Sequence, residues 1–323
     1  MGMKQFIATP YNTKESMGWV MRYVTGPSKK YRGLVRGMPH SHELNRNVAV
    51  KHRLAIVGDI MTIRSGSVEF GPRLREFIKG SDYLVGNFEG TITNAVRPGL
   101  TLAFEERHAP RIIEALTDLF APEKTCLCVS NNHSGDFGRA EFFRSIELLE
   151  AEGFRLFGWL ERPHLDIENS FRLVCGTMWT NKPCDYICML KGAEERVRPG
   201  VFNLLYPHFG YEFELYPRPE MIELGRKLTQ KFDALVGHHA HCPQPVTTHS
   251  VGGVNKMIAY SAGDFLGSYK TKKYQYGMII KAEIGTAPDG SWLMGRAEWR
   301  FTRYVPGAKG RIVVDVAEED LFA

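Results

Sequence analysis

The sequence predicts an α/β protein, and three observations carry this prediction. From Leu54 onward, short apolar runs of strand length alternate with longer amphipathic stretches, which is the order of elements in an α/β chain. Six of the apolar runs are followed directly by short clusters of Asp, Asn, Glu or His. The chain has 323 residues, of which 43% are hydrophobic, so it can bury a full core in one large domain or two smaller ones.

Residues 1–52 are predicted to form an N-terminal extension. They are poor in hydrophobic periodicity and rich in Gly, Pro, Lys, Arg and Asn, with one short helix expected near Glu15–Tyr23. We expect this extension either to wrap around the main domain or to mediate self-association as a homo-oligomer. The stretch Met1–Ala8 has no sustained apolar region of the kind found in secretory signals.

The main domain is predicted to span residues 53–303, with strands and helices in alternation. Strands precede the six polar clusters at Leu54–Val57, Tyr83–Val85, Cys126–Val129, Val201–Tyr206, Ala234–Val236 and Met257–Tyr260. Two further strands are expected at Arg155–Phe157 and Phe171–Thr177. Helical spacing of apolar residues predicts helices at Gly71–Lys79, Pro110–Leu119, Arg139–Ala151 and Pro219–Lys231.

The last part of the domain is predicted to be an antiparallel hairpin. Its strands are Gly277–Ile284 and Trp292–Phe301, and Pro288-Asp289-Gly290 between them is a strong turn signal. Residues 304–323 are expected to form a C-terminal tail. The stretch Met178–Arg198 lacks periodicity and is expected to be a lid or an insertion that faces the substrate. Together with Arg97–His108 it is expected to line the substrate pocket.

Charge and cysteine content limit the classes of partner. The net charge is +5 and the pI is about 8.8, which suits a small anionic substrate but is too weak to predict nucleic-acid binding. No apolar run approaches the roughly 18 residues of a membrane helix. The six cysteines lack the spacing of a disulfide scaffold, so we expect free thiols and a cytoplasmic location. A structural zinc site at Cys184 and Cys188 is disfavoured, because no paired Cys/His knuckle accompanies them.

The polar clusters stand where an open α/β sheet binds its ligands, at the carboxyl ends of the strands. They are Gly58-Asp59, Gly86-Asn87-Phe88-Glu89-Gly90, Ser130-Asn131-Asn132-His133, His208-Phe209-Gly210-Tyr211-Glu212, Gly237-His238-His239-Ala240-His241 and Ser261-Ala262-Gly263-Asp264-Phe265. Carboxylates, amide oxygens and imidazoles are the ligands that hard or borderline divalent metals prefer. Six such strand ends therefore predict one shared metal site and favour a metal-dependent hydrolase.

Each cluster alone also has an ordinary structural explanation. Asp59 could cap a helix or form an Asx-turn, and Asn131-Asn132 before Gly135 could be a turn. A lone His208 would more often be a hydrogen-bonded histidine of the core or surface. Three histidines within the four positions His238–His241 reverse those odds and favour a site.

Taken in order, the clusters, with Asp136, Gly138 and Gln244-Pro245, resemble the CapA/PgsA capsule-synthesis family of poly-γ-glutamate biosynthesis. The resemblance runs from about Leu54 to Gly267. The fold of that family is similar to the calcineurin-like metallophosphoesterases, so the resemblance implies a four-layer α/β/β/α sandwich. Two residues depart from the family pattern: Asp264 stands where the family usually has Asn, and Met221 stands near a usual Gln.

The resemblance also implies a ligand set for one or two divalent ions, Mn, Zn or Fe. Asp59 and His241 would hold one ion, Asn132, His208 and His239 would hold the other, Glu89 would bridge them, and Asn87 is a possible additional ligand. The phosphoesterases commonly begin with Asp-x-His, whereas Asp59 is followed by Ile60-Met61. The first ion would therefore bind weakly or be absent, or another residue such as Asp264 would complete its set of ligands.

The same resemblance implies catalytic roles for two further residues. His133 would donate a proton to the departing alkoxide, and Asp136 would orient it and raise its pKa. An extended His239-x-His241 segment would point both rings the same way, so His238 is expected to point away. Glu212 could orient a ligand without contacting an ion itself.

Two functions follow from these residues. The first is metal-dependent hydrolysis of a phosphate ester, in which two ions activate a water molecule and neutralise the phosphoryl oxygens. The alternative is a non-catalytic, accessory role in the synthesis or binding of an anionic polymer such as poly-γ-glutamate.

Overall fold

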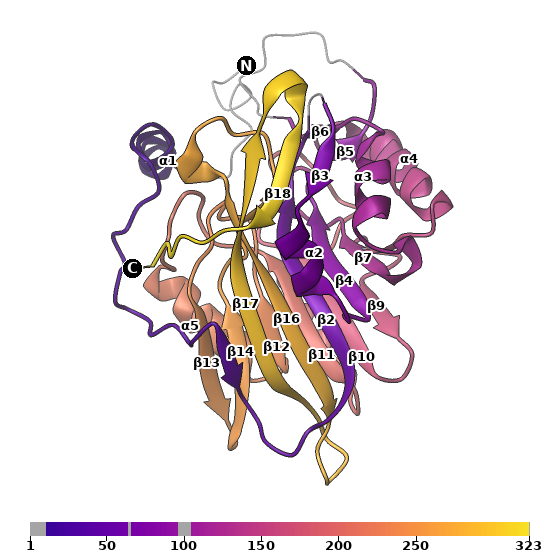
Figure 1. The fold of residues 1–323 in the computed structure, drawn as a ribbon, viewed down its shortest axis with the longest axis vertical. Helices are drawn as coiled ribbons and strands as arrows, with labels where there is room; N and C mark the ends of the chain where they lie inside the picture. The colour runs from indigo at the N-terminus through magenta and orange to yellow at the C-terminus, as the bar shows by residue number, and fades with distance from the viewer. Residues whose placement is uncertain (1–10, 64–65, 96–104, 323) are drawn as a thin grey trace.

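Two large β-sheets packed face to face form the centre of the molecule, and helices lie outside them (Figure 1). The computed structural model describes residues 11–63, 66–95 and 105–322. The helices are α1 (Thr13–Thr25), α2 (Pro72–Ile78), α3 (Ile112–Leu119), α4 (Gly138–Ala151) and α5 (Pro219–Leu228). Short 3₁₀ turns lie at Pro122–Lys124, Ala193–Arg196, Lys272–Tyr274 and Ala308–Gly310.

The first sheet has ten strands and a parallel half that leads to the polar clusters. In order across the sheet they are β3 (Val68–Phe70), β18 (Ile312–Val316), β17 (Trp292–Pro306), β16 (Tyr276–Thr286), β2 (Ala49–Ile60), β4 (Tyr83–Phe88), β7 (Thr125–Cys128) and β8 (Arg155–Phe157). Two short strands join outside this order, β1 (Ser41–Glu43) on β17 and β15 (Asp264–Leu266) on β2. Strands β2, β4, β7 and β8 run parallel, so their carboxyl ends share one edge.

The second sheet has six strands, and its four central strands are also parallel. Its order is β13 (Val246–Val251), β14 (Val254–Ala259), β12 (Ala234–Val236), β11 (Phe202–His208), β10 (Phe171–Thr177) and β9 (His164–Ile167). The edge strands β13 and β9 pair antiparallel with their neighbours. A separate two-stranded ladder joins β5 (Thr91–Ile92) and β6 (Arg107–His108).

Alternation along the strands assigns side chains to different layers. In β2, Leu54 and Ile56 pack between the two sheets, whereas Ala55 and Val57 pack against α2, α3 and α4. In the second sheet, Leu204 points between the sheets and Leu205 packs against α5. The sequence of a strand that is covered on both faces is typically a continuous apolar run. The predicted four-layer α/β/β/α sandwich is therefore confirmed.

The predicted elements recur with small changes at their ends. The N-terminal helix is present as α1, and the Asn12 side chain caps it by accepting a 3.0 Å hydrogen bond from the Glu15 amide. The late hairpin is present as β16 and β17, with Gly290 at φ +83° in the turn. The domain division stays a prediction: residue 52 falls within β2, and residues 304–323 contain β18, which pairs with β17.

The cysteines are free thiols, as expected, and five of the six are buried. Cys126, Cys128, Cys175 and Cys188 belong to the core between the two sheets, where they act as small apolar side chains. Across residues 11–63, 66–95 and 105–322, no helix is both long enough and apolar enough to cross a bilayer.

Candidate metal centre

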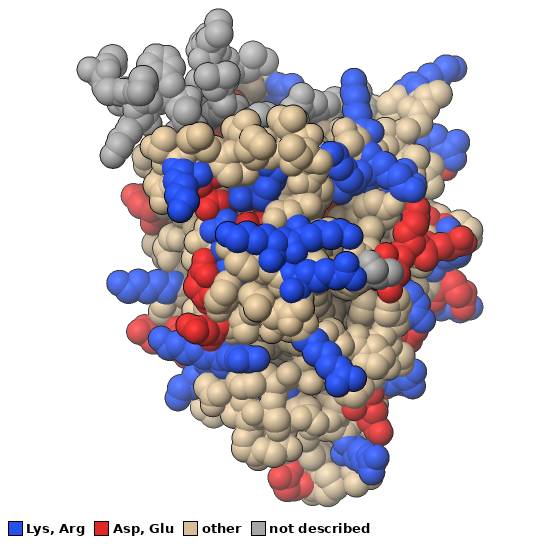
Figure 2. Space-filling view, turned by 90° about the vertical axis from the view of Figure 1, so that its left-hand side faces the viewer, with Lys and Arg blue, Asp and Glu red and all other residues tan. Residues whose placement is uncertain are grey.

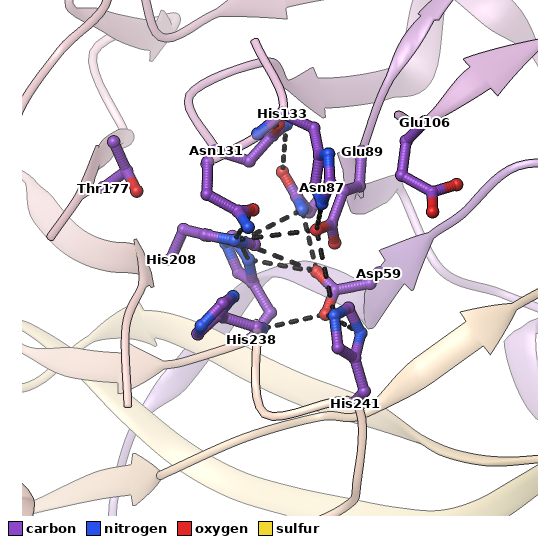
Figure 3. Close-up of polar contacts among 12 residues, drawn as sticks. Asp59, Asn87, Glu89, Glu106, Asn131, His133, Thr177, His208, His238 and His241 are labelled. Carbon is purple, nitrogen blue, oxygen red and sulfur yellow. Dashed lines mark hydrogen bonds and ion pairs between the residues drawn. The ribbon is translucent and has the colours of Figure 1, made fainter. Parts of the chain in front are cut away.

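The predicted site residues meet at the shared carboxyl edge of the two sheets, between the sandwich layers (Figure 3). Asp59 lies in β2, Asn87 near the end of β4, and His208 at the end of β11, while the others follow β4, β7 and β12. The six predicted ligands are at most 3% exposed: Asp59, Glu89, Asn132, His208, His239 and His241. The convergence on which the functional prediction depends is therefore present.

Two glycines allow the strand ends to approach this closely. A Cβ atom on Gly58 would lie 1.9 Å from the carbonyl oxygen of Gly263, which belongs to the turn before β15. A Cβ atom on Gly237 would lie 2.2 Å from the ring of Phe209. These two glycines thus allow neighbouring segments to come close to the backbone, because a residue with a side chain would clash there.

Glu89 occupies the middle of the centre. Its Oε1 atom lies 3.7 Å from His208 Nε2, 3.8 Å from His133 Nε2 and 4.0 Å from His241 Nε2. Glu89 is fully buried, and within the described residues neither of its carboxylate oxygens has a hydrogen-bond partner. A buried carboxylate without a partner is costly unless a proton or a cation neutralises it, so this position suits a bridging metal ligand.

Asp59 and His241 lie close to each other in the centre. The Oδ2 atom of Asp59 is 3.6 Å from His241 Nδ1 and accepts a 2.8 Å hydrogen bond from the backbone amide of His239. Asn87 donates a 2.7 Å hydrogen bond from Nδ2 to Asp59 Oδ1, and its own oxygen lies 3.4 Å from Asn131 Nδ2. Asn87 is thus at the centre, where it turns its nitrogen toward the carboxylate of Asp59.

Asn132, His208 and His239 also belong to the centre. Asn132 Oδ1 is 2.7 Å from His208 Nε2, which is a hydrogen-bond length, and the same Nε2 atom lies 3.7 Å from Glu89 Oε1. The Nδ1 atom of His239 is buried without a hydrogen-bond partner in the described structure. The Nε2 atom of His239 lies 3.5 Å from the Tyr11 hydroxyl and 3.9 Å from Glu212 Oε1. Glu212 therefore stands outside the ligand cluster, beside one of its histidines.

The expectation that His238 points away from the site is wrong. Its Nδ1 atom is 3.2 Å from Asp59 Oδ1 and 2.8 Å from His208 Nδ1, and the residue is fully buried. The expectation assumed an extended segment, but His239 has φ +91° and His241 has φ +50°. Because this backbone does not alternate as a strand does, three histidines of the run reach the same cluster.

The charges of the cluster favour a cation. In the described parts of the chain, the carboxylates of Asp59, Glu89 and Asp264 form ion pairs with histidines alone. Burial, and then repulsion from Asp59, raise the pKa of Glu89 well above its usual value. Burial also raises the pKa of Asp264, to about 7, against the attraction of His241.

Asp59 has the opposite shift. Burial acts to raise its pKa, but hydrogen bonds and attraction from His238, with further contributions from His241 and Asn87, hold the pKa below its usual range. Asp59 therefore stays ionised, whereas the raised pKa of Glu89 favours its protonated form. A bound cation would take the place of that proton and stabilise both carboxylates in their ionised form.

The donor set fits metal ions by number and spacing. Potential ligand atoms cluster in three groups, and within each group they lie within 4.8 Å of one another. The groups are Asp59, His208 and His238; Glu89, His239 and His241; and Asp59, His241 and Asp264. Oxygen and imidazole donors of this kind suit Zn, Mn or Fe. The unpartnered atoms of Glu89 and His239 are the positions at which such ions would complete the contacts.

His133 and Asp136 form the predicted pair next to this cluster. The Nδ1 atom of His133 is 2.7 Å from Asp136 Oδ2, which also accepts a 2.9 Å hydrogen bond from the Glu106 amide. Burial acts to lower the pKa of His133, but the Asp136 carboxylate outweighs it and raises the pKa above the usual value. The histidine is therefore held in a form that can donate a proton from Nε2.

The segment Met178–Arg198 borders the site. The Asn181 amide donates a 2.9 Å hydrogen bond to the Asn132 carbonyl, and Lys182 Nζ donates a 3.0 Å hydrogen bond to the Asp136 carbonyl. The ring of Trp179 meets His239 edge-on at 5.0 Å. Tyr186 and Ile187 of this segment pack into the core under α4.

Sequence reasoning missed some residues that support the centre. The Nε2 atom of buried His108 lies 2.9 Å from the Glu89 carbonyl oxygen, and no sequence signal distinguishes this histidine. Asn131 donates a 2.9 Å hydrogen bond to the Phe88 carbonyl, and its place beside Asn132 was the available signal. Of the predicted lining segment Arg97–His108, residues 97–104 lie outside the described residues.

Sequence comparison places these clusters in a known family. The family described as "Bacterial capsule synthesis protein PGA_cap" matches residues 53–167 and 190–269, which is more than half of the chain. The PGA biosynthesis protein CapA of Bacillus subtilis (strain 168) is 24% identical over 242 residues, which cover 66% of this chain. The Capsule biosynthesis protein CapA of Bacillus anthracis is 24% identical over 281 residues, or 74% of this chain. The matches span 62% and 67% of those two relatives.

Two solved structures are also similar. A hypothetical protein from Thermus thermophilus has 13% identity and a TM-score of 0.43, over 76% of this chain and 97% of its own. The calcineurin-like phosphoesterase YfkN from Bacillus subtilis has 13% identity and a TM-score of 0.44, over 77% of this chain and 90% of the matched one. On the strength of the family match, the chain belongs to the bacterial capsule synthesis protein PGA_cap family.

Proposed function

We propose that this protein is a metal-dependent hydrolase of phosphate esters. The observation that carries the proposal is the carboxylate of Glu89, which is fully buried, unpartnered in the described structure, and surrounded by imidazole nitrogens at 3.7–4.0 Å. Two atoms that lie about 2.0–2.2 Å from a shared zinc ion are themselves about 3–4 Å apart, so this spacing suits shared cations. The substrate class is a small phosphorylated anion.

The ligands divide around Glu89 as follows. Asp59 and His241 would hold one ion, and Asn132, His208 and His239 would hold the other. Bound Mn, Zn or Fe ions would supply a water molecule of lowered pKa and neutralise charge on the phosphoryl oxygens. Asn87 keeps Asp59 in place through its 2.7 Å hydrogen bond.

His133 is the group that would protonate the leaving oxygen. The Asp136 carboxylate accepts the hydrogen bond from Nδ1, so the proton at Nε2 is directed toward the centre near Glu89. Asn181 lies 3.5 Å from the same Nε2 atom and limits the movement of the ring. A positioned acid of this kind typically contributes about 10²–10⁴-fold to a reaction rate.

A metal-dependent activity screen tests the proposal. The full chain, stripped with a chelator and reloaded with Mn²⁺, Zn²⁺ or Fe²⁺, should hydrolyse phosphomonoesters or phosphodiesters, and Glu89→Gln should abolish both turnover and tight ion binding. Glu283→Gln is a matched control, since Glu283 lies in β16 and pairs with Arg53 away from the centre. A chain that binds metal ions but hydrolyses no phosphate ester would contradict the proposal.

A second function, binding of an anionic polymer without hydrolysis, is favoured by one surface feature. A pocket of about 610 Å³ is lined in part by Lys29, Lys272, Lys273 and His241. Figure 2 shows Lys and Arg side chains gathered across the side of the molecule that carries α1 and the C-terminal residues. The relatives named for PGA and capsule biosynthesis make poly-γ-glutamate the polymer to test.

Polymer binding and hydrolysis are separable by experiment. Binding of poly-γ-glutamate should weaken with salt and with Lys29→Glu, while Lys124→Glu, an exposed position near β7, should leave it unchanged. Absence of any affinity for the polymer removes this second function. Because the six cysteines are free thiols, we also propose a reducing compartment such as the cytoplasm.

A further inference from the structure

Asp264 is a buried carboxylate that the proposed ligand set leaves unassigned. It begins β15, where its Cα atom is the register partner of that of Asp59 in β2, so the two carboxylates leave adjacent strands side by side. Asp264 is fully buried, its Oδ1 atom lies 2.8 Å from His241 Nδ1, and its Oδ2 atom has no hydrogen-bond partner in the described structure. Such a group is either a ligand or the partner of one.

The distances around His241 distinguish these two roles. The 2.8 Å contact with Asp264 is a normal hydrogen-bond length, so Nδ1 carries a proton that it donates to the carboxylate. The other ring nitrogen, Nε2, lies 4.0 Å from Glu89 Oε1, which is too long for a hydrogen bond and suits two ligands of one ion. His241 therefore turns its lone pair toward Glu89 and its N–H toward Asp264.

We propose that Asp264 is a positioning residue for the metal ligand His241. By accepting the hydrogen bond from Nδ1, it selects the tautomer whose Nε2 lone pair faces Glu89, and it holds the ring in that direction. The inference rests on the metal centre of the proposed function. It assigns Asp264 to the partner of a ligand rather than to the ion itself.

The backbone of His241 explains why the ring needs such a partner. His241 has φ +50°, a conformation that non-glycine residues seldom adopt and that the surrounding structure must hold in place. The hydrogen bond to Asp264 links this turn to β15, and β15 is itself held against β2 beside Asp59. The carboxylate thus couples the direction of one ligand to the strand that carries another.

The chemistry of the acceptor is the second part of the inference. A carboxylate behind a ligand histidine makes the imidazole a stronger donor to its ion, whereas an amide oxygen accepts the same hydrogen bond without the charge. The isosteric change Asp264→Asn should therefore keep the geometry of the site and weaken the binding of the ion. Partners of this kind typically contribute about 10–100-fold to metal affinity.

The test is a calorimetric titration of the metal-free full chain with Zn²⁺ and with Mn²⁺. Asp264→Asn should bind as many ions as the wild-type chain, with the affinity for one of them lowered about 10–100-fold. His241→Ala is the reference for a lost ligand and should lose that ion. Asp233→Asn is the control for loss of a carboxylate elsewhere, because Asp233 accepts a hydrogen bond from the backbone amide of Asn203 in the second sheet.

Two readouts separate positioning from ligation. If Asp264→Asn loses an ion as His241→Ala does, or changes the absorption of bound Co²⁺ as a lost ligand would, Asp264 is a ligand and the inference is overturned. Unchanged affinity overturns it as well. A wild-type chain that binds no cation overturns the proposed function together with this inference, so the two failures are distinguishable.

A measurement on the unaltered chain covers the case in which the variant fails to fold. With the histidines labelled by ¹⁵N and Zn²⁺ bound, the His241 resonance, assigned by its loss in His241→Ala or His241→Gln, should show a proton on Nδ1. A proton on Nε2 instead would contradict the positioning role.

Discussion

The Nδ1 atom of His133 lies 2.7 Å from Asp136 Oδ2, and its Nε2 atom faces Glu89 Oε1 at 3.8 Å. The ring thus spans the distance between a carboxylate that holds it and the carboxylate at the middle of the metal centre. Both residues of the pair come from the loop between β7 and α4, three positions apart, so their contact is local. Their direction toward Glu89, in contrast, depends on the packing of β4 against β7.

The first prediction concerns proton donation by this histidine. His133→Ala should lower turnover about 10²–10⁴-fold for alkyl phosphates, because the leaving alkoxide is then unprotonated. The loss should be much smaller for p-nitrophenyl phosphate, whose leaving group is stable without a proton. Steady-state rates for the two substrates, with metal content measured in parallel, check it. An equal loss for both substrates would assign His133 to another role.

The second prediction concerns the cost of the Glu89 charge. Without metal, and at a pH high enough to ionise Glu89, Glu89→Gln should stabilise the chain by about 1–3 kcal/mol, because it removes a buried charge that has no partner. With metal, the wild-type chain should gain stability that the variant lacks, about 2.7 kcal/mol when the ion is at 100 times its Kd. Thermal melting with chelator and with added Zn²⁺ measures both effects. A destabilised metal-free variant contradicts this reasoning.

The third prediction is a pH dependence at α1. Glu15 accepts hydrogen bonds from Arg218 at 2.7 and 2.9 Å, and from Arg22 at 2.8 Å. Burial acts to raise the pKa of Glu15, but these guanidinium groups outweigh it and lower the pKa. A carboxyl whose pKa is lowered by folding stabilises the fold above its usual pKa of about 4.3, and that stability is lost as pH falls through the lowered value.

Hydrogen exchange of the α1 amides at a series of pH values measures this dependence. Protection should fall below about pH 4, and Glu15→Gln should reduce it by about 1.5 kcal/mol at neutral pH and remove the dependence. Glu76→Gln is a control, since Glu76 is an exposed residue of α2 paired with Lys79. Protection that does not change with pH in the wild-type chain would rule out this ion-pair network as the attachment of α1.

The fourth prediction concerns the strand contact that carries Asp264. Gly58→Ala should destabilise the chain by about 1–3 kcal/mol or more, because its Cβ atom would lie 1.9 Å from the Gly263 carbonyl. The displaced turn would also weaken ion binding through Asp264 and His241. Gly37→Ala is the control, as its Cβ would meet neighbours only at 3.8 Å or more. Urea unfolding of both variants measures the change in stability, and a Zn²⁺ titration of both measures the change in ion binding.

The elements and the candidate ligands were predictable from the sequence because both are local properties. Apolar runs such as Leu54–Val57 show burial on both faces, and the polar residues that follow them are adjacent in the chain. The motif order then identified Glu89, His208 and His239 as members of one site, and the structure brings them together. The family pattern was informative here because six separate clusters had to occur in one order.

Other features depended on the tertiary structure. Three histidines of the run His238–His241 reach the same cluster because the backbone at His239 and His241 has positive φ, which no periodicity reveals. The contact of Asp264 with His241 arises because β15 pairs with β2, although the two strands lie far apart in the chain. The sequence by itself thus determined which residues bury and which chemistry gathers at the strand ends. Only the packed chain decided which nitrogen faces which oxygen, because those distances depend on backbone torsions and strand pairing across the whole molecule.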